Sequence, residues 1–270
     1  MAQTPTTPIL LLGAGRLGGA LLDGWDLTGA FAPADLIIRD PQPGEAAKLA
    51  AGKGAVLNPP DAALGRARVV LLAVKPQMWR EAALALEPHL AADAVIVSVA
   101  AGVRAGDISR AFGGRPTARV MPITAVAVAQ GAGAIYAADP RASAAAHALF
   151  DPVARMVDLG DEAQMDAVTA VCGSAPAYLY AFTEALEAAG AHLGLAPDAA
   201  RTLARATVAG AAALMTHTGE EPSELRRQVT SPGGTTEAAL KVLMGEGGLT
   251  PLMRAAAEAA ANRSRELSKS

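Results

Sequence analysis

The first half of the chain alternates short apolar runs with helical patterns. Ile9 to Leu12 is an uninterrupted apolar run that ends at Gly13, as expected for a strand buried on both faces. The same pattern recurs, with helical segments between most of the runs, at residues 36–38, 69–74, 95–99, 118–121 and 134–136. Strands that alternate with helices predict a doubly wound α/β sheet of parallel strands over about residues 7–160.

The pattern changes near residue 160. Asp161-Glu162 can start a helix, and almost everything from there to the C-terminus has helical periodicity. Breaks between helices are predicted near residue 173 and at residues 194–197, 219–222, 231–234 and 245–251. We therefore predict two domains, an α/β domain over residues 1–160 and an all-α domain over residues 161–270.

The composition bounds the stability and the partners of the chain. Hydrophobic residues make up 51% of the 270 residues and aromatic residues only 3%, so the core consists mostly of Ala, Leu and Val. Such helices bury little area per residue, and we expect part of the stability to come from a second subunit. The net charge of −3, without a Lys/Arg cluster, argues against nucleic acid as a partner.

Cysteine use and hydropathy point to a cytoplasmic protein. Cys172 is the only cysteine, so an intramolecular disulfide is excluded and a reducing compartment fits. Residues 1–8 lack the charged-then-apolar order of a secretion signal. The uncharged stretch 120–138 contains Pro122 and Gly131, and it predicts two short strands joined by a loop instead of a membrane span. No metal-binding cluster is predicted.

A glycine-rich loop follows the first predicted strand and opens a helix. In Gly13-Ala14-Gly15-Arg16-Leu17-Gly18, Gly13 permits a tight turn and Gly15 lets the backbone approach a pyrophosphate. Gly18 allows close packing of the helix on the strand, while Arg16 and Leu17 form the first helical turn beside the phosphates. The loop predicts a Rossmann-type dinucleotide site; the alternative is a sharp turn that binds nothing.

Two further segments are predicted at the same edge of the sheet. Arg39-Asp40 ends the second strand, where an Asp commonly holds the ribose diol of NAD and an Arg can pair with the extra phosphate of NADP. The sequence leaves this choice open, and a plain surface ion pair remains the alternative. Ala73-Val74-Lys75-Pro76 ends the next parallel strand, so Lys75 is better placed to meet a cofactor than an arbitrary surface lysine.

A second candidate site lies far along the chain. Thr230 to Thr236 is too rich in Gly and Pro for a core, and Glu237 and a helical Ala/Leu pattern follow it. A loop that opens a helix points backbone N–H groups outward at the positive end of the helix dipole, ready to hold an anion. The chain therefore reads as a two-site enzyme.

The helical half offers no acid–base residue for carbonyl reduction. No lysine occurs between Asp161 and Leu240, and His192 and His217 stand alone as surface or helix-end residues. Cys172 has no nearby His and is most simply a small buried residue. A protonated imine already carries its proton, so its reduction needs only orientation and polar donors.

These segments resemble the pyrroline-5-carboxylate reductases, the enzymes that make proline. The resemblance runs essentially end to end, and its most specific part is Val229 to Thr236. Supporting matches are the first glycine loop and the segments Ala73–Gln77, Arg119–Pro122 and Gly173–Tyr178.

The resemblance implies a role for each matching residue. Thr236 would be catalytic and hydrogen-bond the imine nitrogen, and Ser231 of the same loop would also bind the substrate. The backbone around Gly233, Gly234 and Thr235 would hold the substrate carboxylate. Lys75, Pro76 and Met121 would lie against the cofactor, NADPH or alternatively NADH. The all-α domain would form a homodimer, often assembled as five dimers in a ring, with each site shared between two chains.

Two positions depart from the family pattern. The family usually reads Met-Pro-Asn-Thr-Pro where this chain has Met121 to Ala125, so Ile123 removes a polar group near the expected cofactor pocket. The family's Gly-Ser-Gly-Pro appears with Ala175, which adds a methyl group.

Three other functions stay open at this point. They are a reductase of another cyclic imino acid, an NADP-linked 3-hydroxyacid dehydrogenase, and a non-catalytic dinucleotide-binding protein. The dehydrogenase relies on a lysine that is missing from the early helical half, and only Ile123 supports the non-catalytic protein.

Overall fold

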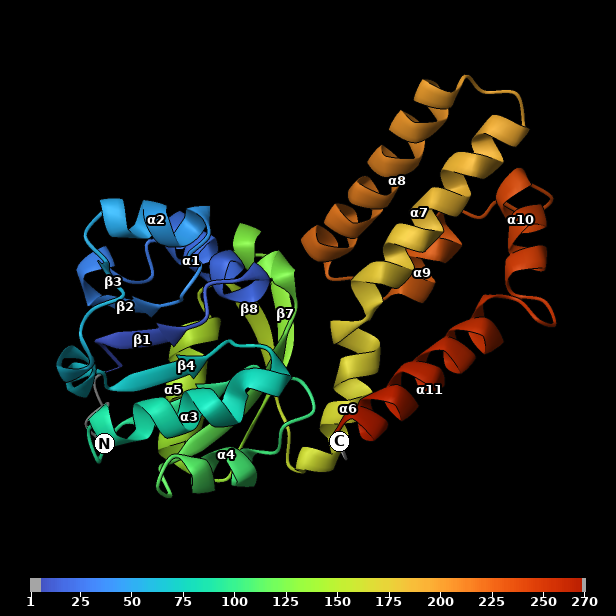
Figure 1. Cartoon of the computed structure of the whole chain (residues 1–270). Helices are drawn as coiled ribbons and strands as arrows, with labels where there is room; N and C mark the ends of the chain where they lie inside the picture. Colours follow the sequence, from blue (N-terminus) through green and yellow to red (C-terminus); the bar gives the residue numbers. More distant parts are fainter. Residues whose placement is uncertain (1–5, 269–270) are drawn as a thin grey trace. The chain divides into compact units, whose positions relative to one another are not determined.

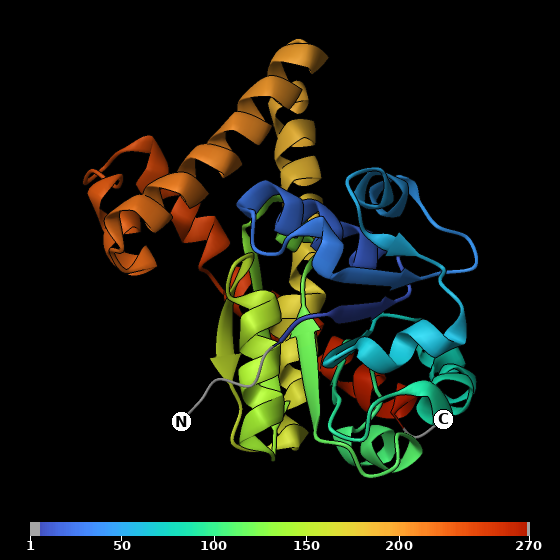
Figure 2. The same ribbon diagram turned by 90° about the vertical axis from the view of Figure 1, so that its left-hand side faces the viewer.

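The computed structural model describes residues 6–268, and within them one eight-stranded sheet (Figures 1 and 2). Its strands lie side by side in the order β3-β2-β1-β4-β5-β6-β7-β8. They span, in chain order, Ile9–Leu12, Leu36–Arg39, Val56–Leu57, Val69–Leu72, Val95–Ser98, Thr117–Pro122, Gly131–Ala137 and Ala154–Asp158. Strands β1 to β6 are mutually parallel, whereas β7 is antiparallel to β6 and β8 is parallel to β7.

Eleven α-helices occur in the described part of the chain. Helices α1 to α5 span Arg16–Thr28, Glu45–Gly52, Trp79–Leu86, Ala105–Ala111 and Pro140–Phe150. Helices α6 to α11 span Met165–Val168, Ala175–His192, Pro197–Thr218, Pro222–Gln228, Thr235–Leu243 and Leu249–Leu267. None of these helices is both long enough and apolar enough to cross a membrane.

The apolar strands are explained by cores on both faces of the sheet. Alternate residues of β1 belong to different clusters: Leu11 packs with Trp25 of α1, and Leu10 packs with Ile108 of α4. Figure 1 shows α1 and α2 on one side of the sheet and α3 and α4 on the other. An uninterrupted apolar run is therefore required in each central strand, because both of its faces are buried.

The fold class expected from the sequence is confirmed, with one correction in the sheet. The strand at residues 134–136 belongs to β7, which does not continue the parallel order. The turn between β6 and β7 is the short 3₁₀ helix Thr124–Val128, and no crossover helix is available there to return the chain for a parallel pairing. Strands β3 and β8 were not expected.

The packing of the chain defines two units, and their limits differ from the boundary predicted near residue 160. The first unit contains the chain up to Gly173 and again from Ala260, and the second contains Ser174–Ala259. The π-helix Thr169–Gly173 packs against β6 and β7, and Ser264 of α11 donates a hydrogen bond of 2.6 Å to the Asp166 carboxylate in α6. The boundary near residue 160 thus marks where the strand–helix pattern ends, not where the packing of the first unit ends.

The second unit has almost no core of its own within one chain. Only Ala200 and Ala204 are buried in it, although α7 and α8 pack against each other. Large apolar side chains of this unit remain exposed, among them Leu179, Tyr180, Leu203, Leu214, Val242 and Leu252. The helices of this unit therefore leave much apolar surface uncovered in the single chain.

A buried charge lies in the middle of β6. Arg119 is only 4% exposed, and its Nη1 lies 3.3 Å from Oε1 of Glu162. The same oxygen accepts a 2.8 Å hydrogen bond from the N–H of Ala105 at the start of α4. Within the described residues, Nε and Nη2 of Arg119 are buried without a hydrogen-bond partner.

His147 links α5 to the edge strand β8. Its Nδ1 lies 3.0 Å from Asp151 and its Nε2 lies 3.0 Å from Asp158, so both ring nitrogens face carboxylates. Partial burial of the ring acts to lower the pKa of His147, but the hydrogen bonds and charges of the two carboxylates outweigh it, and the pKa is raised. Folding therefore stabilises the imidazolium form of His147 relative to the unfolded chain.

This linkage predicts a pH-dependent part of the stability. Because the pKa of His147 is raised on folding, its contribution is complete below the unfolded pKa of about 6.5 and is lost as the pH rises through the folded pKa. In His147→Gln, we expect this loss of stability at alkaline pH to disappear. At pH 6 the free energy of unfolding of the variant should be roughly 0.5–1 kcal/mol lower than that of the unmodified chain, a small difference because solvent screens the site. Urea unfolding of both proteins between pH 5.5 and 8.5 checks this, and identical pH profiles would contradict it.

Candidate active site

The glycine loop of the first unit is shaped by close backbone contacts. Gly13 has φ +91°, and a Cβ there would lie 2.7 Å from the carbonyl oxygen of Ala73. A Cβ on Gly18 would overlap the carbonyl oxygen of Gly13. Glycine is therefore required at both positions for α1 to start directly against β1 and β4.

The loop presents a row of open donors. Within the described residues, the backbone N–H groups of Gly15 to Gly18 have no hydrogen-bond partner, and the first such bond of α1 runs from Gly19 to Gly15. A Cβ on Gly15 would meet nothing within 4 Å, so the space above the loop is open. Arg16 and Leu17 lie in the first turn, as expected. These donors and the helix dipole fit the pyrophosphate of a dinucleotide.

Asp40 holds this loop to the end of β2. Its Oδ2 accepts a 2.6 Å hydrogen bond from the N–H of Ala14, and its Oδ1 accepts one of 2.7 Å from Gln42. Asn58 closes the arrangement, because its side chain exchanges hydrogen bonds of 2.9 and 2.8 Å with the backbone of Asp40. Asp40 thus already accepts a hydrogen bond from the glycine loop with one oxygen and from Gln42 with the other, whereas the sequence offered it as a ligand of a ribose diol.

Arg39 is also engaged within the chain. Its Nη1 lies 2.6 Å from Oδ1 of Asp61 and donates a 3.1 Å hydrogen bond to the carbonyl of Pro59. The sequence reasoning missed Asn58 and Asp61, since neither belongs to a motif. The only signal was their position around Pro59-Pro60, directly after the short strand β3.

The remaining cofactor candidates lie at the carboxyl ends of neighbouring strands. Ala73 and Val74 follow β4, and Lys75 is an exposed residue directly before the 3₁₀ helix Pro76–Met78. Met121 lies at the end of β6, where a Cβ on Gly173 would come within 3.4 Å of its sulfur. Because β1, β2, β4 and β6 are parallel, all of these residues lie at one edge of the sheet.

The second loop joins α9 to α10 in the second unit. Gly233 has φ +71°, and its N–H donates a 2.7 Å hydrogen bond to Oε2 of Glu237. The N–H of Gly234 donates to the carbonyl of Ser231 at 3.0 Å. Both glycine N–H groups expected to hold a substrate carboxylate are therefore engaged within the chain, which narrows the set of donors.

The donors that remain open belong to the first turn of α10 and to the hydroxyls. Within the described residues, the N–H groups of Thr235 and Thr236 have no hydrogen-bond partner, and neither do the hydroxyls of Ser231, Thr235 and Thr236. Two adjacent N–H groups at the positive end of a helix dipole, with three hydroxyls nearby in sequence, fit a carboxylate and a polar nitrogen. Glu237 was not expected as a site residue, although it stands three positions after the helix cap, where an acidic side chain commonly folds back.

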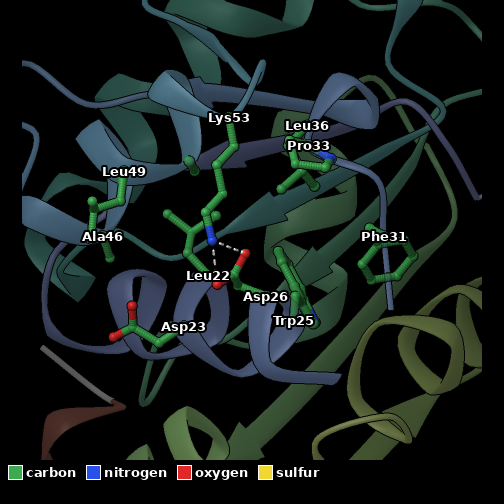
Figure 3. A pocket seen from close by; sticks show the side chains of 11 residues that line it. Leu22, Asp23, Trp25, Asp26, Phe31, Pro33, Leu36, Ala46, Leu49 and Lys53 are labelled. Atoms are coloured by element: carbon green, nitrogen blue, oxygen red, sulfur yellow. Dashed lines mark hydrogen bonds and ion pairs between the residues drawn. The ribbon is translucent and has the colours of Figure 1, made fainter. Parts of the chain in front are cut away.

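Neither the cysteine nor the cavity beside α1 adds a catalytic group. Burial raises the pKa of the Cys172 thiol, so it stays protonated and is a poor nucleophile. A small, mostly apolar cavity lies between α1 and α2 and contains none of the predicted site residues (Figure 3). At its mouth Lys53 forms a 2.6 Å ion pair with Asp26.

Comparison with known proteins connects the two loops to one family. Residues 162–267 match the family model described as pyrroline-5-carboxylate reductase dimerisation, and residues 8–102 match that described as NADP oxidoreductase, coenzyme F420-dependent. The pyrroline-5-carboxylate reductase of Pseudomonas aeruginosa is 40% identical, over 98% of both chains. The chain belongs to the pyrroline-5-carboxylate reductase family.

Other members of the family agree with this assignment. The pyrroline-5-carboxylate reductase of Pisum sativum is 36% identical, over 95% of this chain and 94% of its own. A solved structure of the Coxiella burnetii pyrroline-5-carboxylate reductase is 31% identical and superposes with a TM-score of 0.90, covering 98% of this chain and all of that one. The resemblance found in the motifs is thus confirmed over the whole chain.

The two departures from the family pattern lie at defined places. Ile123 directly follows β6, is half-buried, and donates its N–H to the carbonyl of Ala132 at 3.0 Å. Ala175 is the first residue of α7. Where the family pattern usually has a side-chain amide, this chain therefore has the apolar side chain of Ile123, just beyond the end of β6 at which Met121 lies.

Glu237 provides a test of the loop geometry. Because its carboxylate holds the N–H of Gly233, we expect Glu237→Ala to loosen the loop and raise the KM for the imino-acid substrate roughly 3- to 10-fold. Glu237→Gln is the matched control, since its amide oxygen still accepts this hydrogen bond, and its KM should stay within about twofold of the unmodified chain. Steady-state kinetics with circular dichroism as a folding check measures both. An unchanged KM in Glu237→Ala would mean that the loop keeps its shape without this contact.

Proposed function

We propose that this chain is a pyrroline-5-carboxylate reductase that reduces the cyclic imine 1-pyrroline-5-carboxylate to L-proline with NADPH. The observation that carries the proposal is the 40% identity to the Pseudomonas aeruginosa enzyme over 98% of both chains. The two glycine loops supply the physical reason, because one fits a dinucleotide pyrophosphate and the other fits a carboxylate.

The cofactor is held by the first unit. The open N–H groups of Gly15 to Gly18 bind the pyrophosphate, Arg39 meets the 2′-phosphate, and Lys75, Pro76 and Met121 lie toward the nicotinamide. When bound, NADPH supplies the hydride. The match of residues 8–102 to an NADP oxidoreductase model supports the choice of NADPH.

The substrate is held by the second loop. The N–H groups of Thr235 and Thr236 bind its carboxylate, and the hydroxyl of Thr236 hydrogen-bonds the ring nitrogen. Ser231 adds a further hydroxyl, whereas Gly233 and Gly234 shape the turn and donate to Glu237 and Ser231.

This arrangement explains why no acid–base residue is needed. Hydride addition to the carbon of a protonated imine leaves a neutral secondary amine, so no further proton has to be delivered. Carbonyl reduction would instead require a proton donor, and the chain has no lysine between Asp161 and Leu240. The imine is therefore favoured over a 3-hydroxyacid as the substrate class.

The protein acts as a homodimer, assembled further into a ring of five dimers. The support for the dimer is the match of residues 162–267 to a dimerisation family and the uncovered apolar side chains of α7, α8 and α10. The decamer is proposed from the family resemblance. A cytoplasmic location belongs to the same proposal and is supported by Cys172 being the only cysteine.

An assay with purified protein tests the function. We expect oxidation of NADPH with 1-pyrroline-5-carboxylate, and a roughly 10- to 10³-fold lower turnover in Thr236→Ala, because one polar donor at the reacting nitrogen is lost. Thr218→Ala is a matched control, since this hydroxyl bonds only to the backbone of Leu214 and Glu220 at the end of α8 and should leave turnover unchanged.

The outcomes separate the alternatives. A six-membered imino acid and a 3-hydroxyacid are assayed in parallel, each with NADPH and NADH. If neither cofactor is oxidised with either imine, the reductase assignment fails, whereas a faster reaction with the six-membered ring would move it to another imino acid. Full activity of Thr236→Ala would remove only the role given to that hydroxyl.

Concentration dependence tests the assembly. Because the second unit buries almost nothing within one chain, we expect the midpoint of thermal unfolding to rise by several degrees between about 0.5 and 50 μM protein. Analytical ultracentrifugation over the same range gives the stoichiometry. A monomer at the highest concentration would contradict the dimer, and a dimer alone would contradict the ring.

A further inference from the structure

The end of β2 carries a cation, Arg39, that pairs with a carboxylate from outside the strand. Asp40 follows Arg39 in sequence, and its oxygens are both engaged by backbone N–H groups of the glycine loop and of Gln42. Asp61 lies 2.6 Å from Nη1 of Arg39. The guanidinium that would meet a 2′-phosphate is therefore already neutralised by the chain.

The position of Asp61 is fixed by the backbone around it. It begins the 3₁₀ helix Asp61–Arg66, directly after Pro59-Pro60, and prolines restrict the chain at this point. The carbonyl of Pro59 accepts a second hydrogen bond from the same Nη1 at 3.1 Å. His89 lies on the other side of Asp61, with 3.7 Å between Nε2 and Oδ2. Asp61 is thus placed to hold Arg39 by one edge of its guanidinium.

The other edge of the guanidinium stays open. Within the described residues, Nε and Nη2 of Arg39 form no hydrogen bond or ion pair. A phosphate can use these two donors as a fork, but it then binds an Arg whose charge is shared with Asp61. The ribose hydroxyl of a dinucleotide without the phosphate meets no such competition.

We propose that Asp61 sets the cofactor preference of this enzyme by competing with the 2′-phosphate of NADPH for Arg39. The proposal rests on the cofactor site assigned above. Asp61 lowers the affinity for the phosphorylated dinucleotide and leaves the affinity for NADH unchanged. It is a specificity-determining residue that acts through Arg39 and does not touch the cofactor.

Direct binding tests the proposal without turnover. We expect Asp61→Asn to bind NADP⁺ roughly 3- to 10-fold more tightly in isothermal titration calorimetry. Its affinity for NAD⁺ should stay within about twofold of that of the unmodified chain. The gain should shrink at high salt, because the site is partly exposed. Asp93→Asn is a matched control: Asp93 pairs with Arg68 at 2.9 Å, at the opposite edge of the same sheet, and its loss should change neither affinity.

Arg39→Ala completes the cycle. Alone it should weaken the binding of NADP⁺ and leave the binding of NAD⁺ unchanged. In the Arg39→Ala background, the gain in NADP⁺ affinity from Asp61→Asn should fall below twofold. Weaker or unchanged NADP⁺ binding in Asp61→Asn overturns the proposal, and so does a gain that persists without Arg39. If the unmodified chain bound neither dinucleotide, the cofactor site itself would be wrong, which is a different result.

Discussion

The close contact between Gly18 and the carbonyl of Gly13 is the constraint on which the first unit depends. No side chain fits between them, so α1 starts directly on the loop that ends β1. Gly24, further along α1, repeats the arrangement against the carbonyl of Val126. Between these points α1 buries Leu21 and Leu22, and the N–H groups of its first turn remain open to an anion.

The two glycine loops are held by the same physical device. In each, a carboxylate of the chain accepts a backbone N–H of the loop: Asp40 from Ala14, and Glu237 from Gly233. Glycine-rich segments lose much conformational entropy on ordering, and a charged acceptor offsets part of that loss. The N–H groups of Gly15 to Gly18 in the first loop, and those of Thr235 and Thr236 in the second, remain open within the described residues. The loops are thus ordered without using the donors that the ligands need.

The sequence predicted the central strands and both loops, but not the partners inside the loops. Apolar runs identify β1, β4 and β5 because both of their faces are buried. Side-chain alternation is the same in either strand direction, so the reversal of β7 could not be read. Strand β8 lies at the sheet edge with mostly half-buried or exposed residues and lacks an apolar run.

Contacts distant in sequence escaped prediction for a related reason. Asn58 and Asp61 approach the end of β2 only because β3 pairs with it. The sequence offered the backbone of Gly233 and Gly234 as donors to a substrate carboxylate, yet it could not show that their N–H groups are satisfied within the chain. A motif predicts which loop binds a ligand, whereas the identity of the individual donors depends on side chains that fold back onto the loop.

Besides its contact with Glu162, Arg119 fixes how β6 is aligned with the neighbouring strands of the sheet. Its neighbours Ala118 and Val120 face the apolar core formed with α1 and α5, and Arg119 faces the opposite side. Sliding β6 by one residue would turn the guanidinium into that core, away from the carboxylate of Glu162, at a cost of several kcal/mol. Arg119 thus excludes the misaligned sheet, and it keeps Met121 at the carboxyl edge of the parallel strands.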